Sequence, residues 1–219
     1  MDTNLQEYLS NKNVTLVAVS KTHPDKAILQ LYHKNQRVFG ENKVQELVGK
    51  FERLPKDIAW HFIGHLQSNK VKYIAPFVDT IHSIDSFKIL KEISKQAIKN
   101  KRNIKCLVQV KIAKEKEKFG LEIADLSEFL EAVRHERLEG ITIIGLMGMA
   151  TFTNDEMQIK EEFLSLQNTF KQVKKTYFPK DENFKELSMG MSLDFRIAIE
   201  CGSTMIRIGS LLFGDRVYQ

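Results

Sequence analysis

The segment VAVSKTHP, residues 17–24, places Lys21 directly after an apolar run that has the character of a buried strand. Lysine is seldom buried, and an amine beside a hydrophobic core can lose its charge and attack a carbonyl carbon to form a Schiff base. The alternative is that Lys21 has already left the core and is solvated. The strand alone leaves both readings open.

Two Gly/Ser loops near the C-terminus indicate a second kind of chemistry, within LSMGMSLDFRIAIECGSTMIRIGSLLFG, residues 187–214. We expect Ser192 to cap a helix over residues 193–201 that Gly202 ends. Residues 202–204 then lead into the last strand, and Gly209 and Ser210 open a final short helix. Backbone N–H groups and hydroxyls at such helix starts can bind a phosphate group.

Arg207 interrupts the apolar run 205–208. Because arginine keeps its charge, an inward side chain needs a partner, whereas an outward one would lie over a helix. Strand alternation does not choose between these orientations.

Short β-branched runs alternate with longer segments that carry an apolar residue every three or four positions, such as 87–97 and 163–173. Eight strands are expected, at 14–19, 37–39, 58–63, 78–84, 104–112, 140–146, 186–189 and 205–208. Eight strands separated by helices favour a closed (β/α)8 TIM-type barrel over an open sheet. We predict one domain over residues 1–219.

In such a barrel the chemistry lies at the C-terminal ends of the strands. Polar or flexible residues follow each predicted strand, and we expect them on one rim. They are 20–22, 40–42, 64–70, 83 and 85, 111, 147–149, 188–192 and 207–210.

The composition is that of an ordinary soluble globular protein, with 42% hydrophobic and 28% charged residues. No apolar run approaches the ~20 residues of a membrane span, and the polar residues 1–13 lack the apolar core expected of a signal peptide. The net charge of +5 raises the question of nucleic acid, but its densest cluster, 95–102, falls where a helix is expected to end. Two isolated cysteines, Cys106 and Cys201, point to a reducing cytoplasm and exclude a cysteine metal site.

Several segments match one family in a single order: AVSKTHP, FGENKVQE, WHFIGHLQSNK, IHSID, GLMGMA and 187–214. On these the chain resembles the YggS/PROSC family, which are single-domain proteins of pyridoxal 5'-phosphate (PLP) homeostasis with an alanine racemase-like barrel. The resemblance implies that Lys21 holds PLP as an internal aldimine and that Arg207 faces the pyridine nitrogen. An arginine there leaves the ring nitrogen unprotonated and the electron sink weak.

The resemblance also implies the remaining contacts of the cofactor. The phosphate is expected at Ser192, Gly209 and Ser210, with Ser203 and Thr204 as further contacts and Ser188 as an alternative to Ser192. Asn42, His65 and Asn69 lie on loops that can face the cofactor, while His82 and Asp85 would support the site. His65 is either a general base or a satisfied loop histidine, and Met147 either packs on the pyridine ring or is a plain core residue. One departure is the loop 111–120, where Phe119 replaces a small serine of the family.

Racemases of this class add a C-terminal β-domain and a tyrosine base from a partner subunit. This chain ends at Gln219, directly after the predicted barrel, and Tyr218 is too close to the terminus to replace that domain. We therefore expect a monomeric PLP carrier without catalytic or metal-binding residues, which buffers PLP or delivers it to PLP-dependent apoenzymes. The alternatives are a weak PLP-dependent enzyme, such as an amino-acid racemase, and an aldolase acting on a phosphosugar without PLP.

Overall fold

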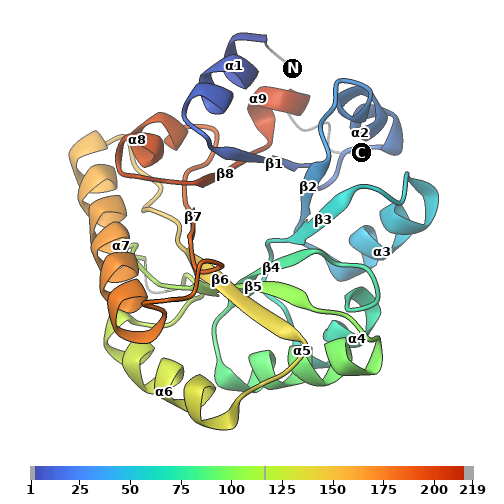
Figure 1. Ribbon diagram of the computed structural model, residues 1–219. Coiled ribbons are helices and arrows are strands. Elements are labelled where there is room, and N and C mark those ends of the chain that lie inside the picture. Colours follow the sequence, from blue (N-terminus) through green and yellow to red (C-terminus); the bar gives the residue numbers. More distant parts are fainter. Residues whose placement is uncertain (1–2, 116, 215–219) are drawn as a thin grey trace.

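The strands of the computed structural model, which describes residues 3–115 and 117–214, close into a parallel barrel (Figure 1). The strands follow one another in chain order, and β8 pairs with β1 to close the barrel. They are β1 Thr15–Val19, β2 Val38–Glu41, β3 Ala59–Phe62, β4 Thr80–Ile84, β5 Ile104–Gln109, β6 Ile141–Met147, β7 Glu186–Ser188 and β8 Met205–Ile208. The predicted (β/α)8 barrel is thus confirmed.

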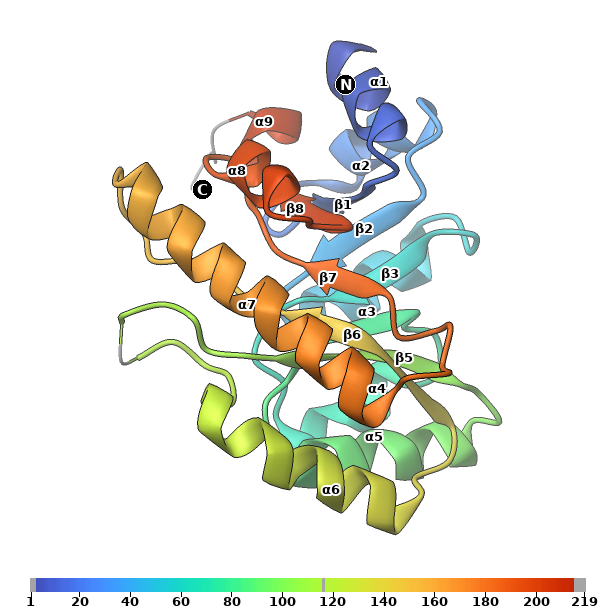
Figure 2. The ribbon, with the colours of Figure 1, turned by 60° about the vertical axis from the view of Figure 1, so that its left-hand side comes forward.

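Helices surround the barrel on its outer side (Figures 1 and 2). The α-helices are α1 Thr3–Asn11, α2 Asp25–Tyr32, α3 Val44–Arg53, α4 Val71–Ile74, α5 Phe87–Lys99, α6 Leu126–Glu136, α7 Glu156–Tyr177, α8 Phe195–Glu200 and α9 Ser210–Phe213. Two short 3-10 helices, η1 Ser68–Lys70 and η2 Ile123–Asp125, precede α4 and α6. The helical periodicity seen at 87–97 and 163–173 falls inside α5 and α7.

The alternation of side chains along each strand divides the core into two parts. Outward residues such as Ala18 and Trp60 join a large apolar cluster with Ile28 of α2 and Leu47 of α3. A smaller cluster consists of Val17, Leu107, Ile144, Met147 and Met205, which come from strands β1, β5, β6 and β8. It follows that polar side chains on these strands are enclosed in a largely apolar surrounding and need partners there.

The start of α8 differs from the prediction. The helix begins at Phe195 rather than at residue 193, and Asp194 occupies the N-cap position. The Asp194 carboxylate accepts a hydrogen bond from the Met191 N–H at 2.5 Å, which ties down the turn before the helix. The prediction that Ser192 caps this helix is therefore wrong. Gly209 does precede the final helix α9, as expected.

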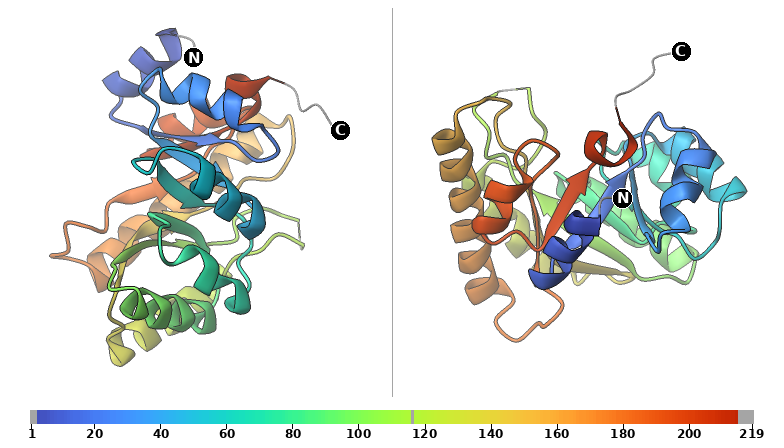
Figure 3. Two further views of the ribbon diagram at one scale, coloured as in Figure 1. Left: turned by 90° about the vertical axis from the view of Figure 1, so that its right-hand side faces the viewer. Right: turned by 90° about the horizontal axis from the view of Figure 1, so that it is seen from above.

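The loops after β5 and β6 project from the same side of the barrel, and α9 lies on that side too (Figures 2 and 3). Because these loops follow the strands, this is the side of the C-terminal strand ends. Strand β5 ends at Gln109, earlier than predicted, and Val110 forms only an isolated bridge with Leu121. Within the described ranges, none of the helices has the length and apolar character needed to cross a membrane.

Candidate functional site

A cavity of about 830 Å³ opens at the C-terminal ends of the strands. This volume is within the range of sites for small molecules and cofactors. Six of the nine residues that the sequence predicted for a cofactor lie on its wall: Lys21, Asn42, Ser192, Arg207, Gly209 and Ser210. Residues up to 189 positions apart in the chain thus meet at one place.

The other three predicted residues do not line this cavity, and their side chains are occupied elsewhere. Met147 is 1% exposed and belongs to the apolar cluster with Val17 and Leu107, whereas Met149 reaches the cavity wall. The Ser203 hydroxyl lies 2.7 to 3.2 Å from three backbone carbonyl oxygens. Thr204 Oγ1 accepts from the Leu187 N–H and donates to Glu186. These hydroxyls join β7 to β8, so the structure corrects their assignment.

The backbone on both sides of Lys21 is anchored by side chains of α3. The carbonyl oxygen of Ser20 accepts a hydrogen bond from Lys50 Nζ at 2.7 Å. The Thr22 N–H donates to Glu46 Oε1 at 2.6 Å, and Thr22 has a left-handed φ of 67°. Lys21 is therefore carried on a short segment whose direction is fixed at both ends.

A buried charge network lies behind this segment, between the barrel and α3. The Glu41 side chain is fully buried, and its Oε1 accepts from Ser20 Oγ at 2.5 Å and from Lys50 Nζ at 2.7 Å. Lys50 Nζ also donates to Glu46 Oε1 at 2.7 Å, so three acceptors surround its ammonium group. Burial raises the pKa of Glu41, and Lys50 and Ser20 oppose that rise.

From the sequence, Ser20 and Glu41 were expected on the rim, whereas Lys50 was not expected in the site. A signal was present, because Lys50 follows Val44 and Leu47 at three-residue spacing on the apolar face of an amphipathic helix. A lysine in such a position requires a buried acceptor.

Arg207 points inward and is 4% exposed. Its Nη1 donates to Ser188 Oγ at 2.6 Å and its Nη2 to the Gly148 carbonyl at 2.9 Å. Burial lowers the pKa of Arg207 to about 10, while the nearby Asp194 carboxylate acts in the opposite direction. The guanidinium therefore stays charged and is held by neutral oxygens at the inner end of the cavity.

Ser192 and the start of α9 also line the cavity. The Gly209 N–H donates to Ser192 Oγ at 3.4 Å, and Ser210 is exposed beside it. A Cβ on Gly209 would stand 3.3 Å from the Val19 carbonyl oxygen, so this loop passes close to the end of β1. Hydroxyls and backbone N–H groups in this arrangement suit an anion such as a phosphate.

Asn42 has a polar atom without a partner. Its Oδ1 is buried and accepts no hydrogen bond among the residues that the structure describes. A Cβ on Gly64 would come within 2.2 Å of the Asn42 carbonyl oxygen, so the loops after β2 and β3 pack backbone to backbone there. A buried acceptor beside a cavity is satisfied when a ligand brings a donor such as a hydroxyl.

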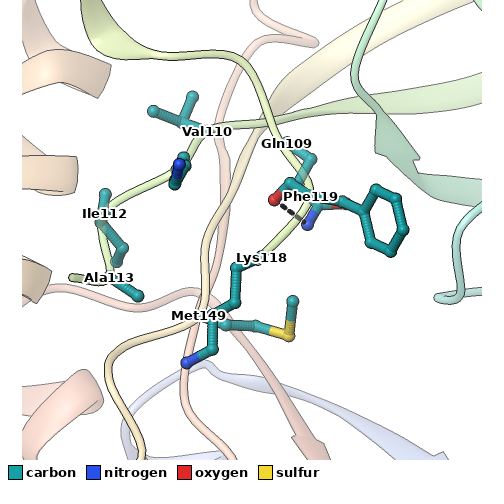
Figure 4. Close-up of a pocket in the computed structure, with 8 residues that line it drawn as sticks. Gln109, Val110, Ile112, Ala113, Lys118, Phe119 and Met149 are labelled. Atoms are coloured by element: carbon teal, nitrogen blue, oxygen red, sulfur yellow. Dashed lines mark hydrogen bonds between the residues drawn. The ribbon is translucent and has the colours of Figure 1, made fainter. Parts of the chain in front are cut away.

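His65 and Phe119 meet across the mouth of the cavity. His65 Nδ1 lies 3.1 Å from Asp85 Oδ2, and its ring stacks on Phe119 with the ring centroids 4.0 Å apart. The Phe119 carbonyl accepts from Gln109 Nε2 at 2.8 Å (Figure 4). The phenylalanine that departs from the family pattern thus joins the loop after β5 to the loop after β3. Asn69 is exposed on η1 and is not part of the wall. Tyr218 lies outside the described residues.

This chain matches known proteins over nearly its full length. The family model Alanine racemase, N-terminal domain, matches residues 3–217. The pyridoxal phosphate homeostasis protein of Aquifex aeolicus is 39% identical over 204 residues, 93% of this chain and 87% of that protein. That of Vibrio alginolyticus is 40% identical over 213 residues, 95% and 89% of the two proteins.

Solved structures also match this chain over nearly its full length. PipY of Synechococcus elongatus without PLP has a TM-score of 0.88 at 36% identity, covering 96% of this chain and 98% of that one. The structure of PipY with PLP bound has a TM-score of 0.84 at 35% identity and the same coverage. The alanine racemase of Clostridium difficile, at 15% identity and a TM-score of 0.70, shares the fold over 59% of its own length.

Proposed function

Because this chain belongs to the alanine racemase N-terminal domain family and aligns with pyridoxal phosphate homeostasis proteins over nearly its whole length, we propose that it binds PLP and serves intracellular PLP homeostasis. The family resemblance found in the motifs is confirmed. The observation that carries the proposal is the meeting of a lysine, a buried arginine and a Ser/Gly loop on one cavity wall.

Each of these groups matches one part of PLP. The Lys21 amine would condense with the aldehyde, forming a C=N bond and releasing one water molecule. Ser192, Gly209 and Ser210 would hold the phosphate, and Arg207 would face the pyridine nitrogen. Asn42 Oδ1 would accept a hydrogen bond from the ring hydroxyl. PLP supplies an electrophilic carbon and a conjugated ring, and the protein residues supply binding and orientation.

We further propose that the protein carries PLP without catalytic turnover. An arginine cannot take the pyridinium proton, so a ring held by Arg207 is a weak electron sink. Removing and returning an α-proton also needs bases aimed at the substrate. The second candidate, a weak racemase, draws support from the His65–Asp85 pair on the cavity side, because an aspartate can orient a histidine as a base.

The place of action that we propose is the cytoplasm. Cys106 and Cys201 are buried and unpaired among the described residues, as in proteins of reducing compartments. Three expectations stay predictions: the chain forms a single domain, acts as a monomer and passes PLP to apoenzymes.

The test is the absorbance spectrum of the purified protein before and after borohydride, followed by peptide mapping. We expect a yellow protein whose cofactor becomes fixed to the peptide that contains Lys21. Lys118→Ala is the matched control, because Lys118 also lines the cavity while it donates to the Ala150 carbonyl. Loss of labelling in Lys118→Ala but not in Lys21→Ala, or absence of cofactor, would refute the assignment.

A further inference from the structure

A continuous row of polar side chains connects the cavity to the other end of the barrel. It begins at Arg207 on β8, continues through Ser188 on β7, His82 on β4 and His61 on β3, and ends at Asp79, the residue before β4. Arg207 lines the cavity, whereas Asp79 stands at the N-terminal end of its strand. The first four residues are at most 4% exposed.

The distances show that each side chain in this row contacts the next, which makes one continuous chain of polar contacts. Arg207 Nη1 lies 2.6 Å from Ser188 Oγ, which lies 3.1 Å from His82 Nδ1. His82 Nε2 lies 2.9 Å from His61 Nδ1. His61 Nε2 lies 3.5 Å from Asp79 Oδ2, which also accepts from Thr80 Oγ1 at 2.7 Å.

We propose that the four contacts are hydrogen bonds that are all donated in the same direction, from Arg207 towards Asp79. Ser188, His82 and His61 are then positioning residues, which fix the Arg207 guanidinium at the cavity. The proposal follows from the two ends of the chain. Arginine has only donors, so the Ser188 oxygen must accept at one end. A carboxylate has only acceptors, so His61 Nε2 must carry a proton at the other end.

The direction of each hydrogen bond between these two ends is then determined. A neutral His61 with its proton on Nε2 offers Nδ1 as an acceptor, so His82 must donate from Nε2. His82 Nδ1 is left as an acceptor for the Ser188 hydroxyl proton, and the Ser188 oxygen receives Arg207. The reverse order would set the lone pair of His61 Nε2 against the Asp79 carboxylate.

The charge states agree with this assignment. Burial lowers the pKa of His61 and of His82, and for His82 the positive Arg207 adds to the effect. His61 holds the pKa of Asp79 well below its usual range, together with Thr80 and Lys105. Two neutral histidines therefore separate one cation from one anion.

This arrangement has a consequence for the cavity. In a one-directional chain each bond polarises the next, so Ser188 Oγ becomes a stronger acceptor for Arg207. The guanidinium is held by Ser188 and by Gly148 on its inner side, and its remaining edge faces the cavity. This chain of hydrogen bonds thus fixes the orientation of the Arg207 guanidinium, which under the proposed function contacts the PLP ring.

The direction of the chain can be tested without cofactor. Long-range 15N–1H correlation on histidine-labelled protein separates the two neutral tautomers and the charged form. At pH 7 we expect His61 and His82 both neutral with the proton on Nε2. In Asp79→Ala the preference should be lost at both rings, although His61 is the one of the two histidines that contacts Asp79. An Nδ1–H tautomer or a charged ring at His82 in the unaltered protein would overturn the proposal.

The positioning role needs a readout at the cavity, and the absorbance and affinity of bound PLP supply it. Ser188→Ala removes one of the two acceptors of Arg207 and should weaken PLP binding by about threefold to tenfold, with a shift of the absorbance maximum. His82→Phe should act in the same direction. Ser94→Ala, an equally buried serine that donates to the Glu139 carbonyl on the outer side, should change neither property.

The outcomes separate this inference from the proposed function. Unchanged PLP spectra and affinities in Ser188→Ala and His82→Phe would overturn the positioning role even if PLP binds at Lys21. If the unaltered protein bound no PLP, the proposed function would fail, while the expected tautomers would still support the direction of the chain. If His82→Phe does not fold, Ser188→Ala and the tautomer measurement decide.

Discussion

Replacing Lys50 by methionine should destabilise the barrel strongly, although the substitution keeps the length and apolar stem of the side chain. The Lys50 side chain is 3% exposed, and its ammonium is the only charge within hydrogen-bonding distance of Glu41 in the described network. Without it the Glu41 carboxylate is buried with one oxygen bonded to Ser20 and the other without a partner.

The expected loss follows from this uncompensated charge. Removing one partner of a buried ion pair costs roughly 3–5 kcal/mol, more than an exposed pair contributes. Glu41→Gln in the same chain removes the charge and keeps an acceptor for Ser20, so the double variant should recover about 2 kcal/mol or more. Burial already raises the Glu41 pKa, and losing Lys50 raises it further. A raised folded pKa favours the protonated folded state, so the defect of Lys50→Met should shrink as the pH falls from 8 to 5.

Urea unfolding of the single and double variants at pH 5 and pH 8 measures these free energies. Lys43→Met, the same change at an exposed position before α3, should remain within about 0.5 kcal/mol of the unaltered protein. The reasoning is refuted if Lys50→Met costs less than about 1 kcal/mol, or if Glu41→Gln adds to its cost instead of relieving it.

Three further predictions concern the cavity and the barrel interior. Ser192→Ala should weaken PLP about tenfold to a hundredfold in equilibrium titration and weaken pyridoxal, which lacks the phosphate, much less; equal losses would count against the phosphate site. Burial lowers the pKa of His61 and His82, so the stability they contribute is present above pH 6.5 and is lost as the pH falls from there through their folded pKa values, by at most about 1.4 kcal/mol per pH unit for each. His82→Phe should flatten this slope in unfolding experiments between pH 6.5 and 5, and an unaltered slope would contradict the assignment. With alanine in heavy water, exchange of the α-proton should stay well below the ~1 s⁻¹ of ordinary enzymes, and faster exchange that disappears in Lys21→Ala would favour the racemase.

Local patterns in the sequence were sufficient for the barrel and for part of the cavity wall. Buried parallel strands and amphipathic helices leave signals within single segments, and the rule that chemistry sits at the C-terminal strand ends then selected Lys21, Asn42 and Arg207. The two Gly/Ser loops indicated a phosphate site, and the resemblance assigned that site to the phosphate of PLP. The resemblance left Met147 either on the pyridine ring or in the core, and the structure places it in an apolar core cluster, with Met149 on the cavity wall instead.

Contacts between distant residues could not be obtained in this way. His82 and Ser188 are 106 positions apart, and nothing local to either residue shows that they meet. The predicted capping of α8 by Ser192 was wrong for a similar reason. Asp194 stabilises the turn before α8, which leaves Ser192 to approach Gly209 from a different strand end.

Under the proposed function, the two polar networks would position the PLP-binding groups from behind the cavity wall. The Glu41–Lys50 network fixes the backbone around Lys21 from the outer side of the barrel, and the chain from Arg207 to Asp79 lies within it. Their titratable groups Glu41, His61 and His82 lie behind the described cavity wall, so they orient the binding groups rather than exchange protons with a ligand. The mouth, in contrast, carries Phe152 and Leu193 at 84% and 82% exposure. Binding groups held in place by buried polar networks favour binding by preorganisation, and an exposed mouth would let PLP enter and leave, as the proposed carrier role requires.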